Sequence, residues 1–137
     1  MAKQPKRWVY SPRKPKKPKV PDSTKAQITQ QAQALIDDYF KPNFIREVEP
    51  DYQWNYIIDI NGKWYRNYYY FISTYRCSSP NCITPTFESK FARMEYTAPN
   101  TFNLSFMRHT DKWAEMLYDL TLEDALKEIA QNQFFHP

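Results

Sequence analysis

Two cysteines carry the clearest potential for chemistry in this 137-residue sequence. Cys77 and Cys82 frame a four-residue loop, and a C-x4-C spacing could supply two thiolate ligands to zinc. The two histidines that would have to complete a tetrahedral site, His109 and His136, lie far apart, whereas structural zinc sites usually have a second tightly spaced pair. We therefore interpret both cysteines as ordinary loop or strand-end residues and expect no metal and no other cofactor. A disulfide would fit such a turn but is unusual in a reducing cytosol.

The densest polar cluster of the chain is Arg108-His109-Thr110-Asp111. Because a histidine titrates near neutral pH, Arg108 and His109, together with Arg93 and Glu95, are candidates for an acid–base site. The spacing of these residues shows no nucleophile next to an oriented base. A solvated strand end and turn is the favoured interpretation of the cluster, and an enzyme or enzyme subunit working there is the second hypothesis.

A basic N-terminal segment is the strongest functional signal. Residues 1–21 hold eight basic residues, no acid and five of the eleven prolines, whereas the chain from Asp22 onward has 11 basic and 15 acidic residues. The net charge of +4 is therefore the sum of +8 for the segment and −4 for the rest. Such a segment can follow phosphates and release counterions, and its aromatic rings can stack on bases. The predicted nucleic-acid contacts are Lys6, Arg7, Trp8, Tyr10, Arg13, Lys14, Lys16, Lys17 and Lys19.

The composition excludes several common classes of protein. A single glycine, Gly62, cannot build a glycine-rich phosphate loop or the nucleophile elbow of a hydrolase. A mean hydropathy of −0.81 without a long apolar run excludes a membrane span and a membrane partner. Since no apolar stretch follows the first charged residues, we expect no secretory signal and a soluble, cytoplasmic protein.

The elements that must position these residues form one domain. Residues 1–21 are expected to be a disordered arm biased toward polyproline II, and residues 22–137 a single α+β domain. A helix is predicted from Ser23 to Phe40, ended by Pro42. A second helix is predicted to begin with Thr121 as its N-cap.

The centre of the chain has the alternation of strands. Four strands are predicted at 52–60, 63–76, 87–97 and 101–109, and they form an antiparallel meander. Asn61-Gly62 is typical of a type I′ turn and predicts a hairpin between the first two strands, and residues 98–100 predict another turn. Residues 113–120 could add a further turn or a short strand. Helices covering one face of this sheet complete the predicted fold.

Aromatic residues are unusually frequent, at 18% of the chain. The alternation predicts Tyr65, Tyr69 and Tyr75 on one face of the second strand and Tyr68 and Tyr70 on the other. Exposed rings among scattered arginines could stack bases. Because the chain has few Leu and Val residues, we favour the alternative that most of these rings form the core.

From Pro21 to the C-terminus the chain resembles a bacterial family, frequent in cyanobacteria, that is known only as a domain of unknown function. The resemblance rests on Lys63-Trp64-Tyr65-Arg66-Asn67-Tyr68, on residues 87–96, on residues 102–110 with Trp113, and on residues 122–126 leading to Phe134-Phe135. It implies no activity, substrate or cofactor. Relatives carry Gly where this chain has Asp111, which argues against a catalytic Asp111.

The preferred hypothesis from the sequence is a small binding module. Its basic arm would contact nucleic acid or another polyanion, and its body would contact a protein or the same nucleic acid. The alternatives are an enzyme around Arg108-His109 and a purely structural interaction protein. Titration with nucleic acid, and a ligand screen repeated with His109→Ala, would separate them.

Overall fold

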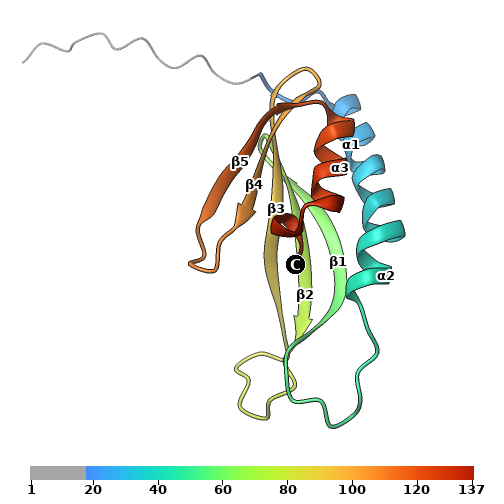
Figure 1. The fold of residues 1–137 in the computed structure, drawn as a ribbon, viewed down its shortest axis with the longest axis vertical. Coiled ribbons are helices and arrows are strands. Elements are labelled where there is room, and N and C mark those ends of the chain that lie inside the picture. Colours follow the sequence, from blue (N-terminus) through green and yellow to red (C-terminus); the bar gives the residue numbers. More distant parts are fainter. Residues whose placement is uncertain (1–17) are drawn as a thin grey trace, which may run out of the picture.

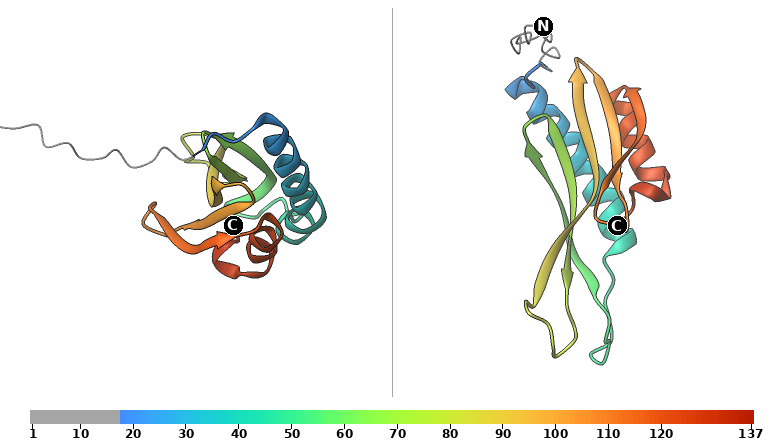
Figure 2. Two further views of the ribbon diagram at one scale, coloured as in Figure 1. Left: turned by 90° about the horizontal axis from the view of Figure 1, so that it is seen from above. Right: turned by 90° about the vertical axis from the view of Figure 1, so that its left-hand side faces the viewer.

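The computed structural model describes residues 18–137. It contains one five-stranded antiparallel sheet of order β1-β2-β3-β4-β5, with the helices packed on one face (Figures 1 and 2). The elements are α1 Asp22–Leu35, the π-helix η1 Ile36–Phe40, α2 Lys41–Phe44, β1 Tyr56–Tyr65, β2 Tyr68–Arg76, β3 Thr86–Ala98, β4 Thr101–Met107, β5 Trp113–Leu120, α3 Leu122–Gln131 and the 3-10 helix η2 Gln133–Phe135. The α+β class is confirmed. Contacts predicted for Lys6, Arg7, Trp8, Tyr10, Arg13, Lys14, Lys16 and Lys17 lie outside the described residues.

The sheet has five strands, so the predicted count of four is wrong. The additional strand is β5, which pairs with β4 in a register that shifts in two places. Near its end, Asp119 adopts a φ of 55°. These irregularities interrupt the alternation of apolar and polar residues along the strand, and this alternation is the signal by which a strand is found in a sequence.

The predicted Asn61-Gly62 hairpin turn is also wrong. β1 runs through both residues, and Gly62 lies opposite Phe71 of β2. The turn comes later, where Arg66 has a φ of 53°. Gly62 serves a close approach instead, because a Cβ at this position would overlap the ring of Tyr69. The first strand begins at Tyr56, and Tyr52 and Trp54, which the sequence pattern assigned to it, are exposed.

The N-terminal helix does not end before Pro42. It continues to Phe44 through a π-turn in which the Lys41 N–H bonds the Ile36 carbonyl, five residues back. In a regular helix the ring of Pro42 would clash with the carbonyl four residues earlier. The wider π-turn directly before the proline relieves this clash and lets the helix go on. The ring centroid of Phe44 thereby lies 5.8 Å from that of Phe40.

Local signals predicted the second helix and the 98–100 turn correctly. The Thr121 side chain accepts a hydrogen bond from the Asp124 N–H at 3.2 Å, as an N-cap does. Leu122, Ala125 and Ile129 of α3 are buried. The turn between β3 and β4 places Asn100 at a φ of 50°, a conformation that asparagine tolerates.

The core lies between the helices and the sheet. It is built largely from rings and β-branched residues, including Phe40, Tyr69, Phe71 and Phe102. Val20 is 1% exposed and belongs to this core, although the sequence pattern assigned it to the arm. The Asn67 side chain donates to the Pro18 carbonyl at 3.0 Å and so attaches this part of the chain to the β1–β2 turn.

Tyr69 gives the core a distinct alkaline pH dependence. Its side chain is 1% exposed, and burial raises the pKa of Tyr69 to about 12 from 10.0. Above pH 10 the unfolded chain loses this proton first, so the free energy of unfolding falls as the pH rises toward 12. The Tyr69 hydroxyl has no hydrogen-bond partner within residues 18–137.

We therefore expect Tyr69→Phe to leave stability at pH 7 unchanged or to raise it by about 1 kcal/mol, because an unpaired buried hydroxyl is removed. The loss of stability above pH 10 should become shallower in this variant. Urea denaturation between pH 7 and pH 11.5 measures both effects. A variant that is less stable at neutral pH would show that the hydroxyl has a partner in solution.

Candidate nucleic-acid interface

Aromatic and basic side chains gather on the face of the sheet that the helices leave open. The strand register places Tyr65 opposite Tyr68, and Tyr70 opposite Arg93, so these residues share one face. We call this surface the outer face; it consists of Lys63, Tyr65, Tyr68, Tyr70, Lys90, Arg93, Glu95 and Trp113. The right-hand view of Figure 2 looks toward it.

The register also corrects the predicted distribution of tyrosines. Tyr65 belongs to β1 and not to the second strand, and it lies on the outer face with Tyr68. Tyr69 points the other way into the core. The expectation that most rings are buried therefore holds for Tyr69 and also for Tyr70, which is 8% exposed, whereas Tyr65 is 55% exposed.

Arg93 stands at the centre of the outer face between two rings. Its guanidinium carbon lies 4.5 Å from the ring centroid of Tyr68 and 4.6 Å from that of Trp113. Lys90 approaches Tyr70 in the same way, at 4.7 Å. Such cation–π contacts hold the basic groups against the rings of the outer face. Glu95 is 4% exposed beside them, opposite Tyr68 in the register.

The β1–β2 turn carries the most accessible ring of this surface. The Arg66 guanidinium carbon lies 5.3 Å from the ring centroid of Tyr65. The same turn holds the Pro18 carbonyl through Asn67, and Lys19 follows directly and is exposed. The basic segment therefore enters the described domain next to an exposed tyrosine with its own arginine.

The structure does not assemble the four catalytic candidates into one site. Arg108 and His109 lie in the β4–β5 turn, where the Arg108 N–H bonds the Lys112 carbonyl at 2.9 Å, and both side chains are exposed. They line a shallow hollow of about 350 Å³ that includes neither Arg93 nor Glu95. The arrangement is that of the solvated turn which the sequence pattern favoured.

The cysteines are not the separate thiols that the sequence analysis expected. Cys77 and Cys82 form a disulfide that closes the loop between β2 and β3, with Cα atoms 6.2 Å apart. Bonded to each other, the sulfur atoms are not thiolate ligands. His136 packs against Phe40 and Phe44, with ring centroids 5.8 and 5.2 Å away. In residues 18–137 there is no group of three or more His, Cys, Asp and Glu side chains that could hold a metal ion.

A comparison with protein families identifies the domain. A family model described as Domain of unknown function (DUF3024) matches residues 20–137. The chain belongs to this family. The DUF3024 match begins at the buried Val20 and includes every described helix and strand, which confirms the resemblance to a family of unknown function. No curated protein and no solved structure matches the chain.

Several residues of the outer face of the DUF3024 domain were not recognised in the sequence as site residues. Lys63, Lys90 and Trp113 come from three different strands, Arg66 comes from the adjoining turn, and no binding motif joins them in the sequence. Their common face follows from the strand register, which depends on long-range pairing.

No helix within residues 18–137 is long and apolar enough to cross a membrane.

Proposed function

We propose that this DUF3024 protein is a binding module for single-stranded nucleic acid. The outer face offers the exposed ring of Tyr65, on which a base can stack, and the N-terminal segment offers the positive charges that contact phosphates. The observation that carries the proposal is the exposed Tyr65 ring, paired with Arg66, beside the point where the basic segment enters the domain.

The charges of the outer face support the same proposal. Lys63 and Lys90 are exposed there, and Arg66 is exposed at the turn. The chain from Asp22 onward carries a formal charge of −4, so attraction to phosphate requires a local concentration of basic groups. The basic segment and the basic groups of the outer face together provide it.

A matched pair of tyrosines tests the proposal. Tyr65 and Tyr118 are 55% and 54% exposed, but Tyr65 lies beside Arg66, whereas the pKa of Tyr118 is raised chiefly by its hydrogen bond to Glu115. We expect Tyr65→Ser to weaken binding of a single-stranded oligonucleotide by about 5- to 100-fold, the cost of losing one stacked base. Tyr118→Ser should bind like the wild type.

Fluorescence anisotropy at about 50 mM NaCl measures this difference, because electrostatic contacts with phosphates are strong at low salt. Circular dichroism verifies that both variants are folded. Equal weakening by the two substitutions would exclude Tyr65 as a stacking residue. Absence of binding by the wild-type chain at micromolar concentrations would exclude the function itself.

A further inference from the structure

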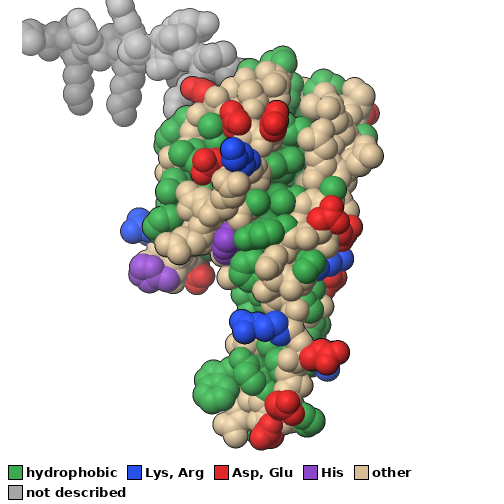
Figure 3. Space-filling view, turned by 45° about the vertical axis from the view of Figure 1, so that its right-hand side comes forward, with side chains coloured by type: hydrophobic (Ala, Val, Ile, Leu, Met, Phe, Trp, Pro, Cys, Tyr) green, Lys and Arg blue, Asp and Glu red, His purple; other side chains and the backbone are tan. Residues whose placement is uncertain are grey.

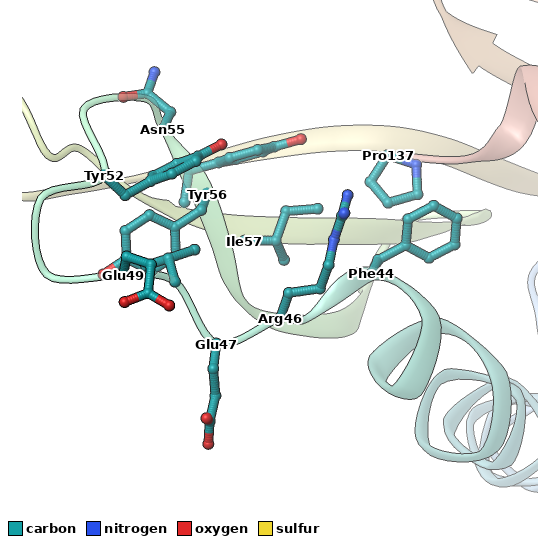
Figure 4. A pocket seen from close by; sticks show the side chains of 11 residues that line it. Phe44, Arg46, Glu47, Glu49, Tyr52, Asn55, Tyr56, Ile57 and Pro137 are labelled. Carbon is teal, nitrogen blue, oxygen red and sulfur yellow. The ribbon is translucent and has the colours of Figure 1, made fainter.

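A second surface lies at the opposite end of β1. A hollow of about 530 Å³ is formed by the end of α2, residues 45–55, the start of β1 and the C-terminal residue. We call it the aromatic groove; the residues that define it here are Phe44, Tyr52, Tyr56, Ile57, Tyr75 and Pro137. In Figure 4 the Tyr52 and Tyr56 rings stand at one end, Phe44 and Pro137 at the other, and Ile57 and Arg46 between them.

Tyr52 is the exposed ring of the groove, whereas Phe44, Tyr56 and Tyr75 are half-buried. Tyr52 is 37% exposed, and its ring centroid lies 5.9 Å from that of Tyr56 and 5.7 Å from that of Trp54, which is 69% exposed. Tyr75 stacks on Phe87 with ring centroids 5.2 Å apart, and Phe87 is 39% exposed. Exposed aromatic rings in and beside a hollow are typical of a binding surface.

The segment 45–55, which forms one side of the groove, is predominantly acidic. Glu47, Glu49 and Asp51 are exposed on residues 45–55, where Arg46 is the one basic residue. Figure 3 shows acidic and hydrophobic side chains together at this lower end of the molecule. Aromatic-lined grooves of this kind bind proline-rich segments in the polyproline II conformation, and acidic side chains at the rim select basic residues in such a segment.

The chain itself contains a segment with this chemistry. Its prolines at 12, 15, 18 and 21 recur at every third position, and each interval between them holds at least one lysine. Because polyproline II has three residues per turn, this spacing aligns the prolines along one edge. Pro21, the last of these prolines, directly precedes α1. Its backbone has φ −62° and ψ 147°, the polyproline II values.

The segment cannot reach the groove of its own copy. Pro18 is held at the β1–β2 turn by Asn67, and the groove lies at the other end of β1. From Tyr56 to Tyr65, β1 spans about 30 Å at 3.3 Å per residue. Pro12 lies six residues before Pro18 and, fully extended, reaches at most about 22 Å from it.

We propose that the aromatic groove binds the proline-rich segment around Pro12 and Pro15 of a second copy of this chain. The contact is head-to-tail, so each copy offers one segment and one groove. It uses the end of β1 opposite to the β1–β2 turn, where the N-terminal segment enters the domain, and does not rest on the proposed nucleic-acid function. Because one short segment buries little area, we expect association with a Kd between about 1 μM and 1 mM.

Two full-length variants test the contact. In the segment variant, Pro12→Ser and Pro15→Ser are combined, which keeps every charge; in the groove variant, Tyr52→Ser is combined with Glu49→Gln at two exposed positions. Sedimentation velocity of nuclease-treated protein, over concentrations up to about 1 mM, should show association of the wild type and monomers for each variant. Pro5→Ser, outside the three-residue spacing, should associate like the wild type.

Mixing the two variants gives the decisive measurement. The segment variant keeps an intact groove and the groove variant keeps an intact segment, so an equimolar mixture should form a one-to-one dimer and nothing larger. A mixture that stays monomeric would overturn the proposal. So would a monomeric wild type at the highest concentration, or variants that associate as strongly as the wild type, because the contact would then use another surface.

Discussion

Replacing Lys14, Lys16, Lys17 and Lys19 together by serine is expected to weaken nucleic-acid binding by roughly three to four orders of magnitude at about 50 mM salt. Each lost phosphate contact removes a released counterion, which on a single strand lowers the slope of log K against log salt by about 0.7. Four lost contacts lower it by about 2.8, and at about 50 mM salt, which is roughly 1.3 log units below 1 M, this gives the expected loss. The domain does not compensate, because the chain from Asp22 onward carries a formal charge of −4. The four prolines between residues 12 and 21 stay in place.

The salt dependence of binding identifies the cause of this loss. If about five phosphates are contacted, log K on duplex DNA should fall with log salt at a slope near −4 to −5, and the four substitutions should bring the slope close to −1. Deletion of residues 1–17 should have an equal effect and leaves the buried Val20 in place. An unchanged slope after the four substitutions or after the deletion would mean that the segment does not contact phosphates.

Trp8 and Tyr10 should show stronger fluorescence quenching with single strands than with duplex.

Phe40→Ala is expected to lower the free energy of unfolding by about 3–5 kcal/mol. Phe40 is fully buried at the point where the N-terminal helix meets the sheet. Its ring centroid lies 5.4 Å from that of Phe91, 6.1 Å from Phe71 and 5.8 Å from His136. Alanine would leave a cavity among rings on two strands and at the C-terminus, and these elements cannot collapse together to fill it.

Phe134→Ala is the matched control for this cavity. Phe134 contacts Phe106 at 5.3 Å between ring centroids but is 53% exposed, so its removal should cost about 1 kcal/mol or less. Urea denaturation of both variants, followed by circular dichroism, measures the difference. Similar losses for the two substitutions would show that the helix–sheet contact around Phe40 adds little to stability.

Short-range interactions explain what could be predicted about the fold. The second helix begins at Thr121 because a threonine oxygen caps an N–H three residues later, a contact within one turn. The turn at residues 98–100 depends on the left-handed conformation of one asparagine. Both signals depend on neighbours in the chain, so they can be interpreted without the tertiary structure.

Gly62 and Pro42 show where local signals mislead. Asn61-Gly62 is typical of a type I′ turn, yet the structure uses the glycine to make room for the ring of Tyr69 seven residues later. Pro42 predicts a helix end, yet a π-turn lets the helix continue to Phe44. In both cases the packing of rings in the core outweighs a local preference of the order of 1–3 kcal/mol.

The sequence by itself determined the α+β class, the two helices and the separation of a basic, proline-rich segment from an acidic domain, since composition and short-range periodicity carry these properties. The tertiary structure decided which aromatic residues form the core and which form the outer face and the aromatic groove. Tyr65, Tyr69 and Tyr75 have the same side chain but lie in these three different places. Strand register sends each to its face, and register is set by pairing and packing between residues distant in the chain.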